Sequence, residues 1–432
     1  MTTSRHVVLG LAPPRAAWFG GVARLATSGG LPVEFVKCVS VAELRARLGS
    51  GRLWSAALVD AAVAGLDRDL IGAAAAHGVP VLVVGERPGR DWAGLGAAAV
   101  LPVGFGRDDL LDALRRHARV VRPAEAVPVV ALGDDPDGDE LDGPGPGALV
   151  AVCGDPGAGA STLAIALAQG LAAGRPGEVL LADLALGADQ ALLHGVGDVV
   201  PGLPELVEAH RLGIPSAERV LELLFGIDER GYRLLLGLRR HRDWATLRPR
   251  AFAAGLASLR RTHEAVVADV DGDVEGEAET GSAEVEERNL LARTVATAAD
   301  VVLVVGGPTL KGLHGLVRTA QDLLAFGVPP ERLLPVVNRA PRPPRLRREL
   351  TGAVAELLGG RIAAVVLVPE HPRLEWALRD RLPLPAAVVR PVAAASRAVL
   401  DRAGPRTMEG PVAERVVAGT LGHWAEGGLA GA

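Results

Sequence analysis

The stretch of sequence that decides the fold runs Val150-Ala151-Val152-Cys153-Gly154-Asp155-Pro156-Gly157-Ala158-Gly159-Ala160-Ser161-Thr162. An apolar run typical of a β-strand leads into a glycine-rich turn, and a hydroxyl pair then opens a helix rich in alanine and leucine. This order places backbone N–H groups and a helix N-terminus around an anion. The sequence therefore predicts a loop that binds phosphate through Gly154, Gly157, Ala158, Gly159, Ala160, Ser161 and Thr162.

The loop departs from the usual phosphate-binding pattern at the position that carries a charge. In G-x-x-x-x-G-K-[ST] the lysine reaches the β- and γ-phosphates, and the hydroxyl binds Mg²⁺. Ser161 keeps the hydroxyl here, whereas Ala160 stands in the lysine position. A charge-assisted contact contributes roughly 1.5–3 kcal/mol, so we expect weak nucleotide binding with little or no hydrolysis. A loop that only caps the helix is the alternative interpretation.

Composition limits the class of protein. The 432 residues are enough for two or three domains, and their 49% hydrophobic and 3% aromatic content predicts cores of Ala, Val and Leu. The net charge of -5 gives no reason to expect nucleic acid as a general partner. Two cysteines, no signal-like N-terminus and no long uninterrupted apolar run lead us to expect a cytoplasmic protein without a transmembrane segment.

Residues 1–122 alternate short apolar runs with helix-like segments. The apolar runs are Val7–Leu11, Val33–Val36, Ala56–Val59, Val81–Val84 and Ala98–Leu101. Strands that alternate with helices predict a parallel, doubly wound α/β domain, and five such units fit the flavodoxin-like order. Asp60 follows the third run, where a carboxylate would lie at the carboxyl end of the sheet.

The rest of the chain divides into three parts. Residues 123–147 are acidic and rich in Gly and Pro without a hydrophobic period, so we expect a linker. Residues 148–405 again alternate strands and helices and predict a second α/β domain, in which the acidic stretch Asp271–Glu287 is expected to be a flexible loop. Residues 406–432 form a tail whose segment Val412–Leu421 predicts an amphipathic packing or partner helix.

Two carboxylates end predicted strands of the second domain. Asp183 follows Val179–Ala182, and Asp269 follows four small apolar residues. Ligand contacts in open α/β sheets lie at the carboxyl ends of the strands. Asp269 and Ser161 are therefore the candidate Mg²⁺ ligands, if a metal binds. A strand-end cap is the other interpretation of Asp269.

The motif order of residues 148–405 resembles the MinD/ParA class of P-loop ATPases, whose loop reads G-K-G-G-x-G-K-T. Asp155 and Ala160 stand in its two lysine positions. Asp183 matches the first acid of the D-x-D motif of this class and is the candidate catalytic residue, whereas Ala185 replaces the second acid, which helps to position the attacking water. The resemblance implies ATP with Mg²⁺ as a weakly bound or vestigial cofactor.

Two later segments carry the same resemblance. Val336-Val337-Asn338-Arg339 matches the nucleotide-base motif, in which the asparagine amide reads adenine. Val368-Pro369-Glu370 resembles the later loop that lies against the base. The resemblance thus implies that Asn338, Arg339 and Pro369 belong to a base pocket that is retained, although the residues for phosphate chemistry are lost.

Residues 1–122 resemble a response-regulator receiver domain, in which Asp60 would be the phosphoacceptor. No acidic pair follows the first strand, and Gly85 and Val103-Gly104 replace the usual hydroxyl and Lys-Pro. A carboxylate without metal ligands or a lysine is a poor phosphate acceptor. We therefore expect a pseudo-receiver that serves as a docking surface, with Asp60 as a pseudo-phosphoacceptor or a solvated loop carboxylate.

Together the two halves are similar to the CpaE/TadZ branch, and within it to the actinobacterial CpaE-like proteins, also called septum site-determining proteins. This resemblance implies a homodimeric positioning factor that is recruited to the cell pole or septum. Its partners would belong to the division septum or to a Flp/Tad-type pilus or secretion apparatus, and no specific nucleic acid is expected. An active, ATP-hydrolysing MinD/ParA-type ATPase and a phosphorylation-controlled response regulator remain as alternatives.

Overall fold

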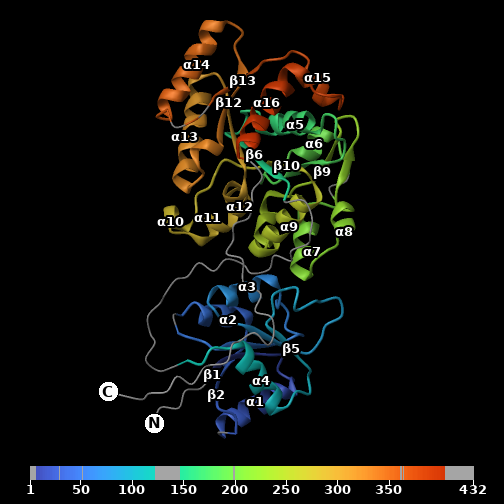
Figure 1. The fold of residues 1–432 in the computed structure, drawn as a ribbon, viewed down its shortest axis with the longest axis vertical. Coiled ribbons are helices and arrows are strands. Elements are labelled where there is room, and N and C mark those ends of the chain that lie inside the picture. The colour runs from blue at the N-terminus through green and yellow to red at the C-terminus, as the bar shows by residue number, and fades with distance from the viewer. Residues whose placement is uncertain are drawn as a thin grey trace, which may run out of the picture.

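The structure is a computed structural model that describes residues 6–28, 30–50, 52–121, 146–197, 200–360, 362 and 364–403. The predicted linker lies outside these residues except for Pro146 and Gly147, and the predicted tail with Val412–Leu421 lies wholly outside them. Two parallel α/β units follow one another along the long axis (Figure 1). Among the described residues, no helix combines the length and the apolar character needed to span a membrane.

The N-terminal unit has a five-stranded parallel sheet. Its strand order is β2-β1-β3-β4-β5, which is the flavodoxin-like order. The strands are β1 (His6–Leu11), β2 (Val33–Cys38), β3 (Ala56–Asp60), β4 (Val81–Val84) and β5 (Ala99–Leu101). The inner strands β1, β3 and β4 are covered on both faces, so their residues are almost all apolar and buried, whereas the edge strand β2 carries Glu34 and Lys37.

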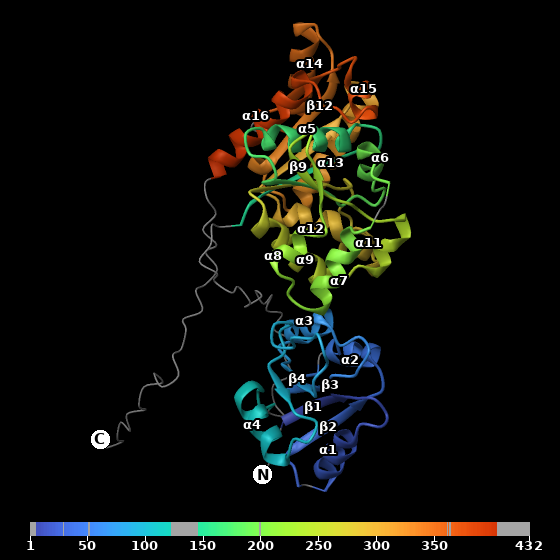
Figure 2. The same cartoon turned by 90° about the vertical axis from the view of Figure 1, so that its right-hand side faces the viewer.

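Four helices cover this sheet. Helices α1 (Ala17–Thr27) and α4 (Arg107–His117) pack on one face, and α2 (Val41–Leu48) and α3 (Arg68–Ala76) on the other. The connection from β4 to β5 contains turns and no helix, and it buries Trp92 instead. This leaves α3 with a face that lies against the second unit (Figure 2).

The C-terminal unit has an eight-stranded sheet of order β13-β12-β11-β6-β10-β7-β9-β8, in which only β8 pairs antiparallel. The strands are β6 (Ala148–Gly154), β7 (Val179–Asp183), β8 (Phe225–Ile227), β9 (Tyr232–Leu235), β10 (Ala265–Asp269), β11 (Val301–Gly306), β12 (Leu333–Ala340) and β13 (Val366–Pro369). The predicted α/β fold with mostly parallel sheets is therefore confirmed.

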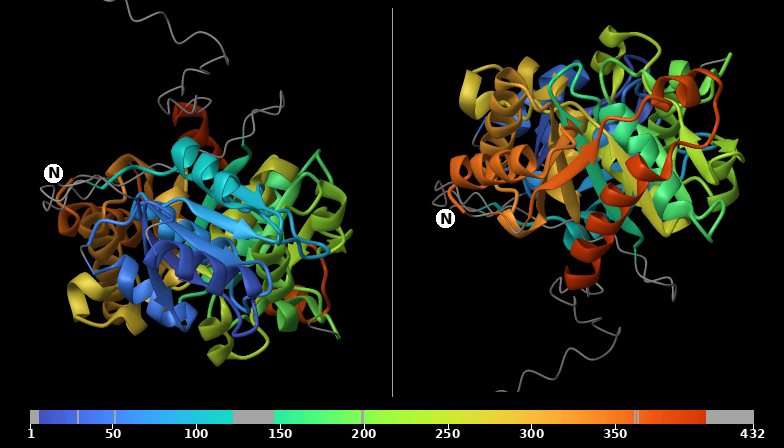
Figure 3. Two further views of the ribbon diagram at one scale, coloured as in Figure 1. Left: turned by 90° about the horizontal axis from the view of Figure 1, so that it is seen from below. Right: turned by 90° about the horizontal axis from the view of Figure 1, so that it is seen from above.

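Two layers of helices enclose this sheet. One layer consists of α5 (Ala160–Ala172) and α16 (Ala386–Ala403), which lie side by side (Figure 3). They approach closely at Gly170, which has no side chain. A Cβ on this residue would stand only 2.5 Å from the Cβ of Ala393. The opposite layer contains α7 (Leu203–Leu212), α9 (Pro249–Thr262), α12 (Leu290–Ala298) and α13 (Leu310–Phe326). Further helices of this unit are α6 (Gln190–His194), α8 (Ala217–Leu221), α14 (Pro344–Leu357) and α15 (Leu374–Arg379).

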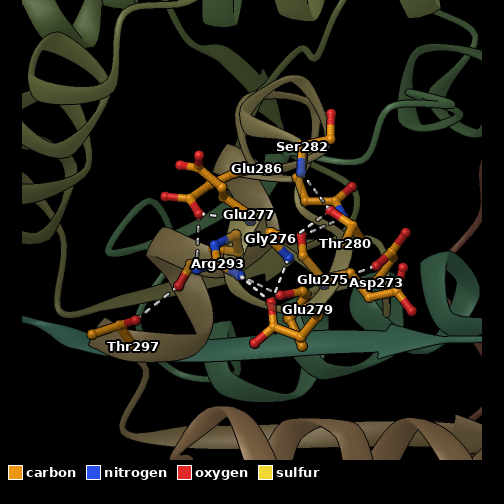
Figure 4. A network of polar contacts seen from close by, with 12 residues as sticks. Asp273, Glu275, Gly276, Glu277, Glu279, Thr280, Ser282, Glu286, Arg293 and Thr297 are labelled. Atoms are coloured by element: carbon orange, nitrogen blue, oxygen red, sulfur yellow. Dashed lines mark hydrogen bonds and ion pairs between the residues drawn. The ribbon is translucent and has the colours of Figure 1, made fainter.

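The acidic stretch Asp271–Glu287 differs from the predicted flexible loop. It contains the short helices α10 (Glu277–Thr280) and α11 (Ala283–Arg288). Arg293 of α12 reaches back into it and donates to the Val274 carbonyl at 2.6 Å. The same guanidinium lies 3.9 Å from Glu279 and 3.6 Å from Glu286 (Figure 4), so one cation offsets part of the acidic charge.

Helix α3 contacts α7 and α9 of the second unit. Asp69 Oδ1 accepts from the backbone N–H of Arg250 at 3.0 Å, and Arg211 Nη1 lies 3.3 Å from Asp67 Oδ2. Arg68 Nε also donates to the His210 carbonyl at 3.1 Å. Burial raises the pKa of Asp69. The two units are thus joined by specific polar contacts as well as by packing.

Candidate functional site

The predicted phosphate-binding loop connects β6 to α5 and depends on two glycines in the left-handed region. Gly157 and Gly159 have φ values of 82° and 92°, which L side chains rarely adopt. A Cβ on Gly154 would stand 2.3 Å from the Val305 carbonyl oxygen, so the start of the loop packs closely on β11. Helix α5 begins at Ala160, and its first N–H groups face the loop as a phosphate site requires.

The lysine position offers no charge. Ala160 is half-buried and packs against the core formed by α5 and α16. The carboxylate of Asp155 turns towards α13, where Oδ1 accepts from Arg318 Nη2 at 3.0 Å. A Cβ on Gly315 of α13 would stand 1.8 Å from Asp155 Oδ2, so that glycine makes room for the carboxylate. The acid beside the loop is therefore neutralised by Arg318.

Asn338 and Arg339, at the end of β12, contact the loop from the other side. Asn338 is 4% exposed, and its Nδ2 donates to the Ala158 carbonyl at 2.9 Å. Its Oδ1 accepts from the backbone N–H of Arg339 at 2.9 Å. The amide that the resemblance assigns to adenine is thus engaged with the loop backbone and positions it.

Arg339 supplies a positive charge at the loop. Its φ of 53° lies in the left-handed region, and its Nη1 is 3.3 Å from the Gly157 carbonyl oxygen. The side chain is exposed, so the guanidinium can turn towards a bound phosphate. The sequence predicted Arg339 as part of a base pocket, not as a cation beside the phosphate loop. The sequence signal for a cation at this place is that Arg339 directly follows Asn338 in an arginine-rich chain.

Asp183 and Asp269 lie next to each other beneath the loop. They are paired in register on the adjacent parallel strands β7 and β10, and are 0% and 2% exposed. Gln190 of α6 joins them, because its backbone N–H donates to Asp183 Oδ2 at 2.9 Å and its Nε2 to Asp269 Oδ2 at 2.7 Å. The same Nε2 is 3.2 Å from the carbonyl oxygen of Ser161. No sequence motif singled out Gln190.

The two carboxyl groups are electrostatically strained. Burial raises the pKa of Asp269 to about 6, against the hydrogen bonds from Gln190 and Ser161, which lower it. Burial, followed by the charge of Asp269, raises the pKa of Asp183 well above its ordinary value. Two neighbouring buried carboxylates cannot both ionise easily without a cation. The site therefore favours either a shared proton or a bound metal ion.

The available oxygens fit a magnesium ion. Asp183 Oδ1 and Gln190 Oε1 are buried and make no close hydrogen bond within the described ranges, although the Ala185 backbone also acts on the Asp183 carboxylate. Together with the Ser161 hydroxyl and the Asp269 carboxylate, they are the hard oxygen donors that Mg²⁺ prefers. No group of three His, Cys, Asp or Glu side chains that could hold a metal occurs in the described part of the chain. Water and phosphate would complete the coordination of a Mg²⁺ ion at these donors.

Pro369 and Asp60 lie elsewhere. Pro369 ends β13 and is paired with Ala340 of β12, so it borders the Asn338 side of the loop. Asp60 belongs to the other sheet, where its Oδ2 accepts from Trp18 Nε1 at 2.7 Å and its Oδ1 from the backbone N–H of Ala62 at 2.9 Å. The structure thus gathers the loop, Asn338, Arg339, Asp183 and Asp269 in one place, and Asp60 forms a separate feature.

No protein-family model matches the sequence, and no curated protein matches it either. Among solved structures, the chain is similar to a ParA family ATPase from Chlorobium tepidum, with 15% identity, a TM-score of 0.46, and coverage of 58% of this chain and 98% of that one. It is also similar to the septum site-determining protein MinD from Pyrococcus horikoshii in complex with Mg-ADP, with 18% identity, a TM-score of 0.44, and coverage of 60% and 97%.

A third similar structure is the MinC:MinD cell division protein complex from Aquifex aeolicus. The identity is 17%, the TM-score is 0.43, and 59% of this chain and 96% of that chain are covered. The structural neighbours are thus ParA- and MinD-family ATPases. At these identities and TM-scores, the likeness carries nothing about the chemistry of this chain.

Proposed function

We propose that this protein is a positioning factor of the CpaE/MinD type whose C-terminal domain, residues 148–405, binds ATP with Mg²⁺ weakly and turns it over little or not at all. The observation that carries the proposal is the loop itself. Its glycine geometry and the hydrogen bond from Asn338 are those of a formed loop, yet the lysine position holds the half-buried Ala160, which packs against the core. A loop that keeps its shape but lacks its main cation suits binding better than catalysis.

Each part of a bound Mg²⁺–ATP would have an assigned contact. The backbone N–H groups from Gly157 to Ser161 would surround the phosphates, and Arg339 would supply the positive charge. Ser161 and Asp269 would hold Mg²⁺, which neutralises phosphate charge when it is bound. The adenine would lie towards Asn338 and Pro369, at the β12–β13 side of the loop.

The missing acid argues against turnover. Ala185 stands where a second carboxylate would orient the attacking water. Asp183, the candidate catalytic residue, is 0% exposed, and its Oδ2 accepts a hydrogen bond from the Gln190 backbone, so it is held beside Asp269. In this proposal Asp183 acts as a positioning residue that holds Gln190 and adds negative charge beneath the metal.

The remaining parts of the proposal concern partners. The N-terminal domain, residues 1–122, would be a pseudo-receiver that docks a partner of the division septum or of a Flp/Tad-type pilus or secretion apparatus. The resemblance in sequence supports these clients and the recruitment to the pole or septum. Two leucines on helices that border the loop are largely exposed, since Leu192 of α6 is 80% and Leu310 of α13 is 89% exposed. A homodimer that buries these apolar side chains is therefore supported.

The proposal is tested by titrating ATP and ADP into the full-length protein with Mg²⁺, while calorimetry follows binding and light scattering follows mass. We expect saturable binding, roughly ten- to a hundredfold weaker than with a loop lysine, and an increase in mass from one chain to two. The absence of any heat of binding would contradict the nucleotide assignment. The loop would then only cap helix α5. Labelling by acetyl phosphate that Asp60→Ala abolishes would instead favour a response regulator.

A further inference from the structure

A second charged group is buried far from the phosphate loop. Arg230, in the turn between β8 and β9, is 4% exposed. Its Nε donates to the Leu382 carbonyl at 3.2 Å, and neither Nη1 nor Nη2 makes a close hydrogen bond among the described residues, although the Tyr232 hydroxyl faces the guanidinium. A buried guanidinium is unfavourable unless its donors and its charge are matched. The arrangement around Arg230 is therefore incomplete as it stands.

The neighbouring side chains do not balance this charge. Tyr232 Oη lies 2.7 Å from His194 Nε2. Burial raises the pKa of Tyr232 to about 12, against the charge and the hydrogen bond of Arg230, which lower it, and burial lowers the pKa of His194 to about 4. Both groups are thus neutral near pH 7, so the Tyr232 hydroxyl contacts the guanidinium without balancing its charge. Asp228 and Glu229 precede Arg230 in the turn but are exposed, and the ion pairs found within the described ranges include none between either of them and Arg230.

Arg230 lines a cavity at the opposite end of α5 from the phosphate loop. The cavity is open to solvent, has a volume of about 720 Å³ and lies between the end of α5, the turn from β8 to β9, and α16. This volume is typical of small-molecule sites. Because α5 has 13 residues, its two ends are about 20 Å apart. The cavity is thus separate from the nucleotide site described above.

Two more arginines line the same cavity. Arg390 and Arg397 project from α16 on its exposed side. Arg397 Nη2 donates to the Gly170 carbonyl and lies 3.5 Å from that of Leu171, which fixes this side chain at the C-terminus of α5. The walls thus carry three guanidinium groups against the two carboxylates of Asp228 and Glu229.

We propose that this cavity binds a small anion of low charge, either a mono- or dicarboxylate or a phosphate. Arg230 is the buried anchor, and Arg390 and Arg397 contact the anion from the cavity wall. A guanidinium presents a planar pair of N–H donors that matches both oxyanions. Asp228 and Glu229 disfavour highly charged ligands such as a triphosphate, so the site selects for an anion of low charge.

The test uses malonate and inorganic phosphate as probes on the full-length protein at constant ionic strength, with calorimetry as the readout. We expect saturable binding of at least one probe, which Arg390→Gln weakens about tenfold. The matched control is Arg345→Gln, because Arg345 is an exposed arginine on α14 outside the cavity. Equal affinity in the wild type and Arg390→Gln would overturn the proposal.

A further variant separates this cavity from the phosphate loop. Arg339→Ala removes the cation at the loop and should leave the affinity for malonate unchanged. If Arg339→Ala rather than Arg390→Gln removes binding, the probe binds at the loop and the proposal is wrong. If only phosphate loses affinity in Arg390→Gln, the oxyanion is a phosphate. If only malonate loses affinity in Arg390→Gln, the oxyanion is a carboxylate.

Thermal unfolding of Arg230→Met tests the anchor itself. Removing an unmatched buried charge should leave the melting temperature in chloride buffer unchanged or higher, and should abolish the stabilisation by the probe. A lower melting temperature with the stabilisation by the probe retained would show a purely structural arginine and overturn the proposal. If Arg230→Met does not fold, Arg397→Gln replaces it, with the same loss of stabilisation expected.

Discussion

Asp60 and Asp269 both end a parallel strand, one in each sheet of this protein, but their surroundings differ. The two oxygens of Asp60 accept hydrogen bonds from Trp18 and from the backbone N–H of Ala62, and the side chain is only half-buried. Asp269 is sealed beneath the loop beside Asp183, and burial raises its pKa. The first carboxylate is satisfied by neutral donors, whereas the second is incomplete without a proton or a cation.

This difference teaches which of the two sites keeps a chemical role. A carboxylate that already has two good donors gains little from a metal, and phosphorylation of Asp60 would have to break the bond from the Trp18 indole. A buried carboxyl pair with unpartnered oxygens gains a great deal from a divalent cation. The ligand chemistry of this chain is therefore expected at Asp269, and the role of Asp60 is to fix its own loop against α1.

The largest expected effect comes from removing the metal-side carboxylate. Asp269→Ala should weaken Mg²⁺-dependent ATP binding about a hundredfold, on the order of 3 kcal/mol, because the metal loses its only charged ligand from β10. Asp60→Ala should leave ATP affinity unchanged and serves as the matched control in the other sheet. Calorimetry of the two variants measures both affinities for ATP. Equal losses of affinity in both variants would contradict the difference between the two carboxylates.

The second effect concerns pH. Folding raises the pKa of Asp269, so the folded protein holds this proton more tightly than the unfolded chain does. The free energy of unfolding therefore falls as the pH rises from 3.8 through about 6. Without metal, this loss should be on the order of 2–3 kcal/mol. Asp269→Asn should remove it. The difference between the two denaturation profiles, measured in EDTA, isolates Asp269 from His194, whose lowered pKa acts in the opposite direction.

The result that would contradict this reasoning is a pH profile that Asp269→Asn leaves unchanged. Such a result would mean that Asp183 holds the shared proton throughout, since the two carboxyl groups titrate as a pair. Asp183→Asn would then be expected to flatten the profile in its place.

The third effect comes from restoring the lysine. Ala160→Lys should tighten ATP binding about ten- to a hundredfold, which corresponds to roughly 1.5–3 kcal/mol from a charge-assisted contact. Ala160→Met has a side chain of similar length without the charge, so it reports any cost of placing a long side chain at this half-buried position. Equal affinities in the Lys and Met variants would mean that Arg339 already supplies the charge that the phosphates require.

The smallest effect belongs to Asp60. Trp18→Phe removes the indole N–H and should lower the free energy of unfolding by about 1 kcal/mol. It should not make Asp60 a phosphoacceptor, because no acidic pair follows the first strand in the sequence and Val103-Gly104 replaces the usual Lys-Pro. Chemical denaturation measures the first expectation and acetyl-phosphate labelling the second. Labelling that appears only in Trp18→Phe would show that the indole blocks a competent site.

Much of this arrangement follows from the sequence. Apolar runs separated by helix-like segments were enough to predict both α/β units, and strand ends were enough to predict that Asp183 and Asp269 lie at one edge. Neighbouring parallel strands bring their carboxyl ends together, which explains why this prediction needs no detail of side chains. The short edge strand β8 (Phe225–Ile227) was missed, because a three-residue strand has no readable period.

The contacts that complete the site could not be predicted in this way. Gln190 lies in a loop-like stretch without a motif, and only the folded position of α6 places its amide on Asp269. Arg293 is a single arginine on α12, and nothing in its local pattern says that it holds the acidic stretch together. Arg230 follows two acidic residues and reads as a solvated turn residue, yet the end of α5 and the segment around Leu382 bury it.

The central claim is that the loop binds a nucleotide without turning it over. It is tested most directly by following phosphate release from ATP by the full-length protein with saturating Mg²⁺, at a protein concentration where calorimetry shows the site to be filled. The account predicts phosphate release indistinguishable from a sample without protein. Release that requires Mg²⁺ and that Asp269→Ala abolishes would contradict it, because the site would then catalyse hydrolysis despite Ala160 and Ala185.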